Sequence, residues 1–341
     1  MKDEGGRMNH TSHQSAVTSH AFAAACQAAL VILLATGTCA AQSYPAKPIR
    51  WIVAFAPGGT GEFLSRTVTP QLGEQLKQQV VVDFRPGAGT TLGATLVAQS
   101  PPDGYAVFLN SVSTMAINHS LYRKLQYDVR RDFAPVTLFA VIPSVLAAHP
   151  SFPARTVKEL VALARANPGK LDFASPGIGT ASHFAVELFK LMAQVDLNHI
   201  PYKGAGPAII DTIAGFVPMV SDNVSSLKAH IDGGKLRAIA VGSDRRTDAL
   251  PGVPSFAESG YPGFEASSWW GVLAPARTPA AVIERLNAEI ARALASPAVR
   301  ERMLTHGATP IPGTPQQAAA KIASEIEKWA KVVQATGVKV D

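Results

Sequence analysis

The stretch AFAPGGTGEF, residues 54–63, follows an apolar run at residues 49–54 and precedes a segment that predicts a helix. The apolar run itself predicts a β-strand. A glycine-rich turn at such a junction leaves N–H groups without partners at the helix N-terminus, where they attract anions. Glycine also permits positive φ and a close approach of the backbone to a ligand. The stretch therefore predicts an α/β fold that carries an anion-binding turn.

Three further turns of this kind stand at predicted strand-to-helix junctions: FRPGAGTTLG (84–93), FASPGIGTASH (173–183) and YKGAGPAII (202–210). In a parallel α/β sheet such turns gather at one edge, where ligands bind. Each helix N-terminus contributes about 0.3–1 kcal/mol to anion binding, whereas micromolar affinity needs about 8 kcal/mol. Several turns must therefore act together, and four of them in one chain favour a carboxylate site over ligand-free tight turns.

A nucleotide site is disfavoured by the same four turns. The first lacks the lysine and the hydroxyl of a phosphate-binding loop, and none matches the dinucleotide-binding pattern with its later acidic residue.

Short apolar runs alternate with amphipathic stretches along most of the chain, which predicts an α/β fold with mainly parallel sheets. Strands are expected at residues 49–54, 80–83, 106–109, 136–142, 171–174, 217–221, 236–241 and 270–274. Helices with one apolar face are expected at residues 156–166, 279–295 and 315–336. Proline-marked segments at 142–153 and 261–275 suggest two lobes joined by two hinge strands. The expected division is 44–143 plus 270–341 for lobe 1 and 144–269 for lobe 2.

Composition narrows the class of protein. The 341 residues are 47% hydrophobic and 16% charged, which is typical of a globular chain with one large core or two smaller ones. The net charge of +6 comes from scattered basic residues. Because no basic stripe with interleaved aromatic residues occurs, nucleic-acid binding is disfavoured, and the diffuse positive charge suits a small anionic ligand.

Residues 1–41 have the pattern of a secretory signal peptide: a polar start, an apolar run at 21–35, and small residues before a cleavage site after Ala41. The alternatives are an uncleaved membrane anchor, although Gln27 interrupts the run, and a lipid-anchored Cys39, although Thr38 suits such a site poorly. Cys26 and Cys39 both lie in this leader, so the exported mature chain is expected to lack disulfides.

Side chains with catalytic or metal-binding potential are sparse. No nucleophile-elbow or zinc-protease motif occurs, and the histidines are dispersed, so no metal, cofactor or catalytic residue is expected. His183 is either an anion donor in the first turn of its helix or a helix-surface histidine. Asp222 and Asn223 either accept from a ligand hydroxyl or cap a helix. Trp269 and Trp270 favour core or hinge packing over a ligand platform.

Six motifs occur in order between residue 44 and the C-terminus: YPAKPIRWIVAFAPGG, VVVDFRPGAG, SPPDGY, PYKGAGPAI, LPGVPSFAESGYPGFEASSWWGVLAPARTP and RLNAEIARAL. In these motifs the chain resembles the periplasmic substrate-binding receptors of tripartite tricarboxylate transporters, also called Bug receptors. The resemblance implies an α/β periplasmic binding protein fold of type II, whose two lobes, each a mixed sheet flanked by helices, close over a carboxylate. It further implies that the turns at 58–62 and 86–91 hold one carboxylate, and that 175–183 and 221–223 complete the site.

The expected ligand-binding residues follow from those turns and from the strand ends beside them: Phe55, Gly59, Thr60, Gly61, Glu62, Phe63, Gly87, Ala88, Gly89, Thr90, Ser111, Ser113, Ser175, Thr180, Ser182, His183, Asp222 and Asn223. The family's first turn usually reads PGGGTD or PGGSTD with an aliphatic residue next, and its second PGAGGN. Here Glu62 and Phe63 stand in the first turn, and the second reads PGAGTT. Glu62 would repel an anion unless it points away or meets a ligand donor, while the flat ring of Phe63 suggests an aromatic carboxylate such as terephthalate.

The function expected from the resemblance is a monomeric periplasmic receptor that captures a small mono- or dicarboxylate and delivers it to a membrane permease, without catalysis. One alternative is an exported α/β hydrolase, which would need a nucleophile–base pair such as Ser182–His183, or Ser111 or Ser113 as nucleophile. The other is a ligand-binding partner of a membrane sensor kinase.

Overall fold

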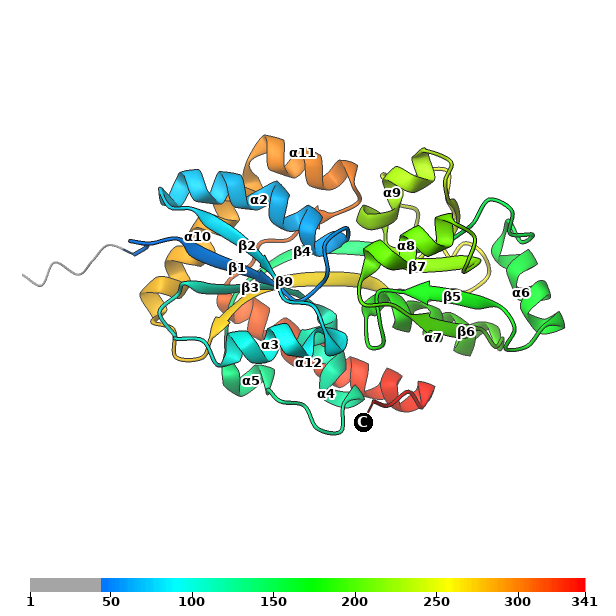
Figure 1. The fold of residues 1–341 in the computed structure, drawn as a ribbon, viewed down its shortest axis with the longest axis horizontal. Coiled ribbons are helices and arrows are strands. Elements are labelled where there is room, and N and C mark those ends of the chain that lie inside the picture. Colours follow the sequence, from blue (N-terminus) through cyan, green and yellow to red (C-terminus); the bar gives the residue numbers. More distant parts are fainter. Residues whose placement is uncertain (1–43, 341) are drawn as a thin grey trace, which may run out of the picture. The chain divides into compact units, whose positions relative to one another are not determined.

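The structure, a computed structural model, describes residues 44–340, and the predicted signal peptide at 1–41 lies outside the described residues. From Pro45 onward the chain forms one unit with two lobes (Figure 1). Its strands follow the order β2-β1-β3-β9-β4-β7-β5-β6, and β10 and β8 also pair with β4. Within residues 44–340, no helix has both the length and the apolar character needed to cross a membrane.

Lobe 1 is built on three parallel strands, β1 (Ile49–Val53), β2 (Val80–Phe84) and β3 (Ala106–Ser111). A helical segment follows each strand, after a glycine-rich turn for β1 and β2 and after the single residue Val112 for β3. The carboxyl ends of the parallel strands share one edge of the sheet. The helical segments of this lobe are α2 (Thr60–Leu76), η1 (Ala88–Thr90), α3 (Thr91–Ala98), the π-helix η2 (Ser113–Ile117), α4 (Asn118–Leu121), α5 (Val129–Asp132), α10 (Ala280–Ala295), α11 (Pro297–Thr305) and α12 (Pro315–Thr336).

Lobe 2 repeats the arrangement on a smaller scale. Strand β5 (Asp172–Ser175) pairs in parallel with β6 (Asn198–Pro201) and β7 (Met219–Asn223). The remaining elements of this lobe are α6 (Val157–Ala166), α7 (Ala181–Ala193), α8 (Ala205–Ile213), α9 (Val224–Asp232) and β8 (Arg237–Val241). Phe173, Phe189 and Phe264 are fully buried at its centre, so this lobe has an apolar core of its own.

Two strands join the lobes, β4 (Phe133–Ala148) and β9 (Ser267–Pro275), which cross the middle of the molecule in Figure 1. Strand β4 pairs with β9 from Phe133 to Pro143, and with β7 from Ser144 to Ala148. All pairs made by β4 and β9 are antiparallel, as is the short β10 (Thr309–Pro310) on β4. The expectation of mainly parallel sheets was therefore wrong for the hinge, because these strands connect lobes and do not belong to strand-helix-strand repeats.

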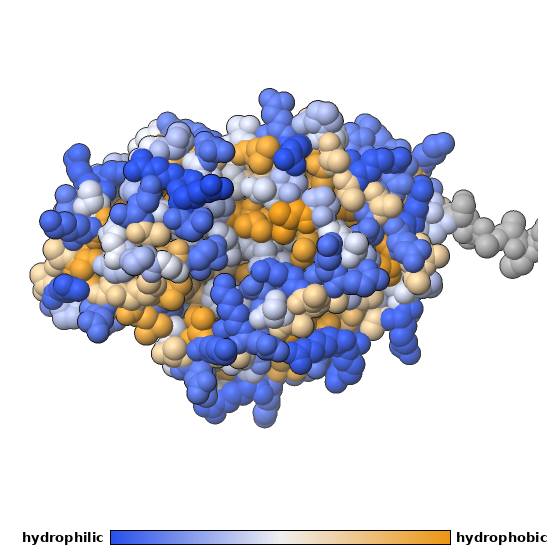
Figure 2. Space-filling view, turned by 180° about the vertical axis from the view of Figure 1, so that it is seen from behind, coloured by the Kyte–Doolittle hydropathy of each residue, from blue (hydrophilic) through white to orange (hydrophobic). Residues whose placement is uncertain are grey.

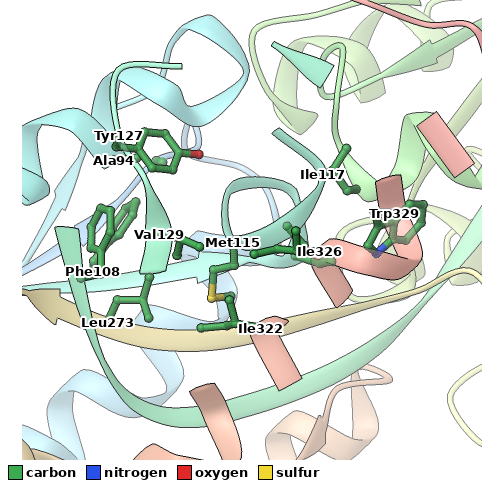
Figure 3. Packing of buried hydrophobic residues seen from close by; sticks show 14 of the residues in the cluster. Ala94, Phe108, Met115, Ile117, Tyr127, Val129, Leu273, Ile322, Ile326 and Trp329 are labelled. Atoms are coloured by element: carbon green, nitrogen blue, oxygen red, sulfur yellow. The ribbon is translucent and has the colours of Figure 1, made fainter. Parts of the chain in front are cut away.

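The C-terminal helix α12 anchors the core of lobe 1. Its residues Ile322, Ile326 and Trp329 face inward, and Figure 3 shows the two isoleucines beside Met115 of η2. Thr314 and Gln317 form a capping box that fixes where this helix begins. The predicted bounds at 315–336 are confirmed. On the face drawn in Figure 2 the surface is mostly hydrophilic, with apolar surface gathered near its middle, so most large apolar side chains are inside.

Each predicted strand is present, and the strand expected at 136–142 extends in both directions into β4. Strands β6 and β10 had no prediction, because NHIP and TP are too short and polar to give a two-residue alternation.

Candidate functional site

The carboxyl ends of strands from both lobes meet at a cavity of about 30 Å³, which has room for roughly two water molecules. Residues after β1 and at the end of β3 line it from lobe 1, and residues after β5 and at the end of β7 line it from lobe 2. We call it the central cavity; its walls are formed by Phe55, Ala56, Gly59, Thr60, Gly61, Ser111, Ser113, Pro176, Thr180, Ala181, Ser182, Ala205, Asp222, Asn223, Ser268 and Trp270.

Four helix N-termini converge on the central cavity. Helices α2, α7 and α8 begin at Thr60, Ala181 and Ala205, and Asn223 is the N-cap of α9; all four residues line the cavity. The first N–H groups of a helix have no partner within it and carry partial positive charge. Among the described residues, no Lys, Arg or His lines this cavity. An anion here would therefore be held by backbone amides and hydroxyls.

The two lobes touch directly beside the cavity. The Thr60 hydroxyl lies 2.9 Å from each of the hydroxyls of Ser225 and Ser226 and accepts from Asn223 Nδ2 at 3.1 Å. On another side, the backbone N–H of Ala181 donates to Ser113 Oγ at 3.1 Å. These bonds join residues of lobe 1 to residues of lobe 2, and we refer to this arrangement, with the lobes in contact, as the closed form.

Asp222 is the charged side chain of the central cavity. Its Oδ1 accepts from Ser182 Oγ at 3.0 Å. Burial raises the pKa of Asp222 to about 6, against the opposing effect of hydrogen bonds from Asn223, Ser226 and Ser182. The carboxyl group is thus ionised at neutral pH but close to taking up a proton.

A second cavity, of about 280 Å³, adjoins the first. The two share Phe55, Ala56, Pro176 and Thr180 as walls. The turn with Gly87, Ala88, Gly89 and Thr90 lines only this second cavity, together with Tyr122, Tyr202 and Lys203. Gly87 and Gly89 have φ of 137° and 58°, and Tyr122 donates to the carbonyl of Ala88 at 2.9 Å. The two glycine turns of lobe 1 therefore face separate cavities, although the resemblance implied that they share one carboxylate.

Most of the predicted site residues lie on one of the two cavities. The central cavity takes Phe55, Gly59, Thr60, Gly61, Ser111, Ser113, Thr180, Ser182, Asp222 and Asn223. The second cavity takes Gly87, Ala88, Gly89 and Thr90, and Thr180 and Phe55 border both. Residues from four strand ends, far apart in sequence, are thus brought together.

Glu62 and Phe63 lie away from both cavities. Glu62 accepts from the N–H of Gly58 at 2.7 Å and pairs with Arg66 at 2.5 Å, and these two contacts lower its pKa. The ring of Phe63 stacks on His306 with centroids 4.7 Å apart. Glu62 therefore accepts a hydrogen bond from its own turn and does not point at a ligand in either cavity. The ring of Phe63 is likewise outside both cavities, so it offers no surface to an aromatic acid there.

Ser175 and His183 lie behind the cavity wall. His183 is buried and stacks on His199 with ring centroids 3.9 Å apart, and Ser175 Oγ bonds His199 Nε2 at 2.7 Å. Burial, with the neighbouring His199 and Lys190, lowers the pKa of His183 to about 2. His183 is therefore neutral and structural, neither of the two roles expected from its place in the sequence.

The expected ligand-binding residues did not include Ala56, Ala205, Ser268 and Trp270 on the central cavity, nor Tyr122, Tyr202 and Lys203, among others, on the second. Pro176 and Ala181 were not named singly but lie within the expected segment 175–183. Trp270 is the important omission, because its ring packs on Phe55 with centroids 5.3 Å apart while only 2% of the residue is exposed. Its place in the returning hinge strand was the available signal, since a hinge strand passes between the lobes.

The proposed nucleophile–base pair is not formed, because Ser182 Oγ donates to Asp222 and the ring of His183 stacks on His199. Within residues 44–340, no three His, Cys, Asp or Glu side chains gather in a set that could hold a metal ion.

Solved structures share this two-lobed fold. The periplasmic binding protein BugD is 34% identical, with a TM-score of 0.84, over 87% of this chain and 99% of that chain. An R. palustris protein with adipate is 34% identical, with a TM-score of 0.84, over 86% of this chain and 98% of that chain. MatC from Rhodopseudomonas palustris, with bound malate, is 31% identical, with a TM-score of 0.81, over 85% of this chain and all of that chain. The predicted periplasmic binding protein fold is confirmed.

Similarity in sequence identifies the family. Protein BugT of Bordetella pertussis is 41% identical over 88% of this chain and 92% of its own length. Residues 64–338 match the family described as tripartite tricarboxylate transporter family receptor. These relatives are binding proteins and receptors, which confirms the prediction that the chain is not an enzyme. The chain belongs to the tripartite tricarboxylate transporter receptor family, the family of the Bug proteins.

Proposed function

We propose that this chain is a periplasmic receptor that captures a small mono- or dicarboxylate between its two lobes and delivers it to a tripartite tricarboxylate-type permease. The observation that carries the proposal is the convergence of four helix N-termini from both lobes on one cavity, which no basic side chain of residues 44–340 lines. Such a cavity favours a carboxylate, which amides and hydroxyls can hold without a countercharge. The adipate and malate in the related structures agree with this ligand class.

We further propose the lobe boundaries, the export signal, the oligomeric state and the ligand contacts. Lobe 1 comprises 44–143 plus 270–341 and lobe 2 comprises 144–269, a division supported by the change of β4's partner between Pro143 and Ser144. Residues 1–41 act as the export signal, and the receptor works as a monomer. The ligand contacts are the predicted residues that line the two cavities, with Trp270 and Ser268 added.

The proposed ligands include aromatic carboxylates such as terephthalate, but the aromatic surface that would contact them is not Phe63. Phe63 faces His306, but Phe55 and Trp270 give the central cavity two apolar ring surfaces. A flat acid would lie against these rings only in a more open form, because the closed cavity has about 30 Å³.

Isothermal titration calorimetry with citrate, succinate, glutamate, nicotinate and terephthalate tests the proposal on the purified mature chain. We expect micromolar or tighter binding of at least one acid and no heat with a neutral sugar. Native mass spectrometry of protein taken from its own periplasm identifies a retained acid directly. Binding only of neutral sugars or amines would end the carboxylate assignment.

A further inference from the structure

Three residues that line the central cavity each carry a buried polar atom without a hydrogen-bond partner in the described part of the chain: Asp222 Oδ2, Asn223 Oδ1 and Trp270 Nε1. The three residues are 3%, 5% and 2% exposed. Folded proteins leave few buried polar atoms unpaired, and each such atom asks for an explanation. Because all three residues line the same cavity, we look for one explanation that covers all three atoms. A ligand that forms hydrogen bonds with each of them is such an explanation.

The chemistry of the three atoms specifies the ligand beyond its carboxylate. Asp222 Oδ2 and Asn223 Oδ1 are acceptors and need a donor, whereas Trp270 Nε1 is a donor and needs an acceptor. A plain carboxylate supplies acceptors alone, so it can satisfy Trp270 but not Asp222 or Asn223. Close to Asp222 it would also meet a like charge, which is unfavourable where water is excluded.

The groups around Asp222 leave this need unmet. Ser182, Ser226 and the N–H of Asn223 donate to the carboxyl group, yet its Oδ2 has no partner within the described residues. No basic side chain lines the cavity among residues 44–340, so no protein cation compensates Asp222 there. The raised pKa of the Asp222 carboxyl has the same origin, because burial without a cation disfavours its charged form.

We propose that the ligand carries a hydrogen-bond donor, a hydroxyl or an ammonium group, close to its carboxylate, and that Asp222 and Asn223 accept from this donor while Trp270 Nε1 donates to the carboxylate. The inference rests on the proposed function and narrows its ligand class to hydroxy- or aminocarboxylates. In this arrangement the helix N-termini provide affinity for the anion, and Asp222 selects the substituent beside it.

Calorimetry at pH 7.5 with acids that differ in one substituent tests the inference. Succinate, malate and aspartate share a four-carbon skeleton and carry H, OH or NH₃⁺ beside one carboxylate. Adipate with its 2-hydroxy and 2-amino derivatives gives the matched six-carbon set. Within the skeleton that binds more tightly, we expect a donor-bearing acid to bind at least about tenfold tighter than the plain one. Tightest binding of the hydroxy acid identifies a hydroxyl, and tightest binding of the amino acid identifies an ammonium.

Asp222→Asn separates recognition from support of the fold. The amide oxygen can still accept from Ser182. The amide NH₂ takes the place of Oδ2, so the atom without a partner becomes an uncharged donor. We expect affinity for the donor-bearing acid to fall by at least about tenfold and affinity for the plain acid to rise, because a like charge is removed. Asp103→Asn makes the same chemical change outside both cavities, where Asp103 pairs with Lys47, and should leave all affinities unchanged. A merely structural role for Asp222 would lower all affinities together.

The outcomes are distinct. If the plain acid binds as tightly as both substituted acids, ordered water satisfies the three atoms and the inference is overturned, while the proposed function stands. If Asp222→Asn keeps the preference for the donor-bearing acid, Asp222 is not its acceptor and the inference is also overturned. If no carboxylate binds, the proposed function fails and the inference fails with it.

Discussion

Replacing Gly59 with alanine places a methyl group directly between the two lobes. Gly59 is the N-cap of α2 and has φ of −121° and ψ of −171°, an extended backbone that any residue adopts. A Cβ at this position would lie 2.9 Å from the Cβ of Ala205, which belongs to lobe 2. The substitution therefore creates a steric clash only in the closed form, while the weaker N-cap affects the open and closed forms alike.

The magnitude follows from this overlap. Ordinary contact of a Cβ begins at 3.4 Å, so the lobes must stay about 0.5 Å further apart or the backbone must shift by that amount. Overpacking of this kind typically costs about 1–3 kcal/mol. Since ligand binding is coupled to closure, the affinity for the carboxylate should fall by about 5- to 150-fold.

Calorimetry with the best-bound acid measures the loss, and small-angle scattering reports the radius of gyration with and without that acid. Gly59 lines the central cavity, so a second variant is needed to separate closure from occlusion. Gly206→Ala places its Cβ 3.1 Å from the carbonyl of Pro57 in lobe 1, and Gly206 lines neither cavity. Gly252→Ala is the matched control, because nothing lies within 4 Å of its Cβ.

We expect both interlobe variants to bind more weakly and to shrink less on ligand addition, and the control to match the wild type. Wild-type affinity in both Gly59→Ala and Gly206→Ala would refute the reasoning, since binding would then not require the contact between lobes seen here.

Three further predictions concern other parts of the chain. Asp222→Asn should raise the free energy of unfolding by up to about 3 kcal/mol at pH 7.5, because the folded pKa of Asp222 lies at about 6 against 3.8 and the penalty for its buried charge is full above 6 and absent below 3.8. Denaturant unfolding at pH 7.5 and pH 4 measures it, and a gain that is the same at both would contradict the assignment. Phe63→Leu should leave the order of ligand affinities unchanged while Phe55→Leu alters it, since Phe63 stacks on His306 and Phe55 lines both cavities; a reordering by Phe63→Leu alone would reverse that view in calorimetry. Trp329→Ala should destabilise the fold by about 3–5 kcal/mol in the same unfolding experiment, because its buried ring packs on Phe184 and its Nε1 bonds Glu325; a cost below about 1 kcal/mol would mean that α12 is not part of the core.

The fold could be predicted because its signals are local. Glycine turns after apolar runs marked the strand-to-helix junctions, and the apolar face of residues 315–336 marked α12. The orientation of β4 and β9 could not be predicted in this way. Antiparallel hinge pairing depends on contacts between residues such as Val141 and Trp269, far apart in the chain, which no local pattern records.

Some residues of the site could be predicted from local sequence and others could not. Thr60 and Gly61 reach the cavity because they open α2, while Glu62 and Phe63 follow at 100° per residue and turn away from it. The sequence indicated which turn reaches the cavity but not which residues of the helix turn away from it.

Residues that meet the cavity through the tertiary fold were beyond local reasoning. Trp270 looks like core from its sequence context, and it is 2% exposed, yet its ring also forms a wall of the central cavity. The sequence predicts His183 to be either a donor at a helix start or a helix-surface histidine, but its ring stacks on His199 and is buried.

A crystal structure of the mature protein with its tightest-binding acid tests the central claim most directly, that helix N-termini from two lobes hold a carboxylate between them. We expect the carboxylate in the central cavity, within hydrogen-bond distance of backbone N–H groups at the starts of α2 and α7, with the lobes in contact through Thr60 and Ser226. An acid bound to one lobe alone, or held by basic side chains outside this cavity, would contradict it.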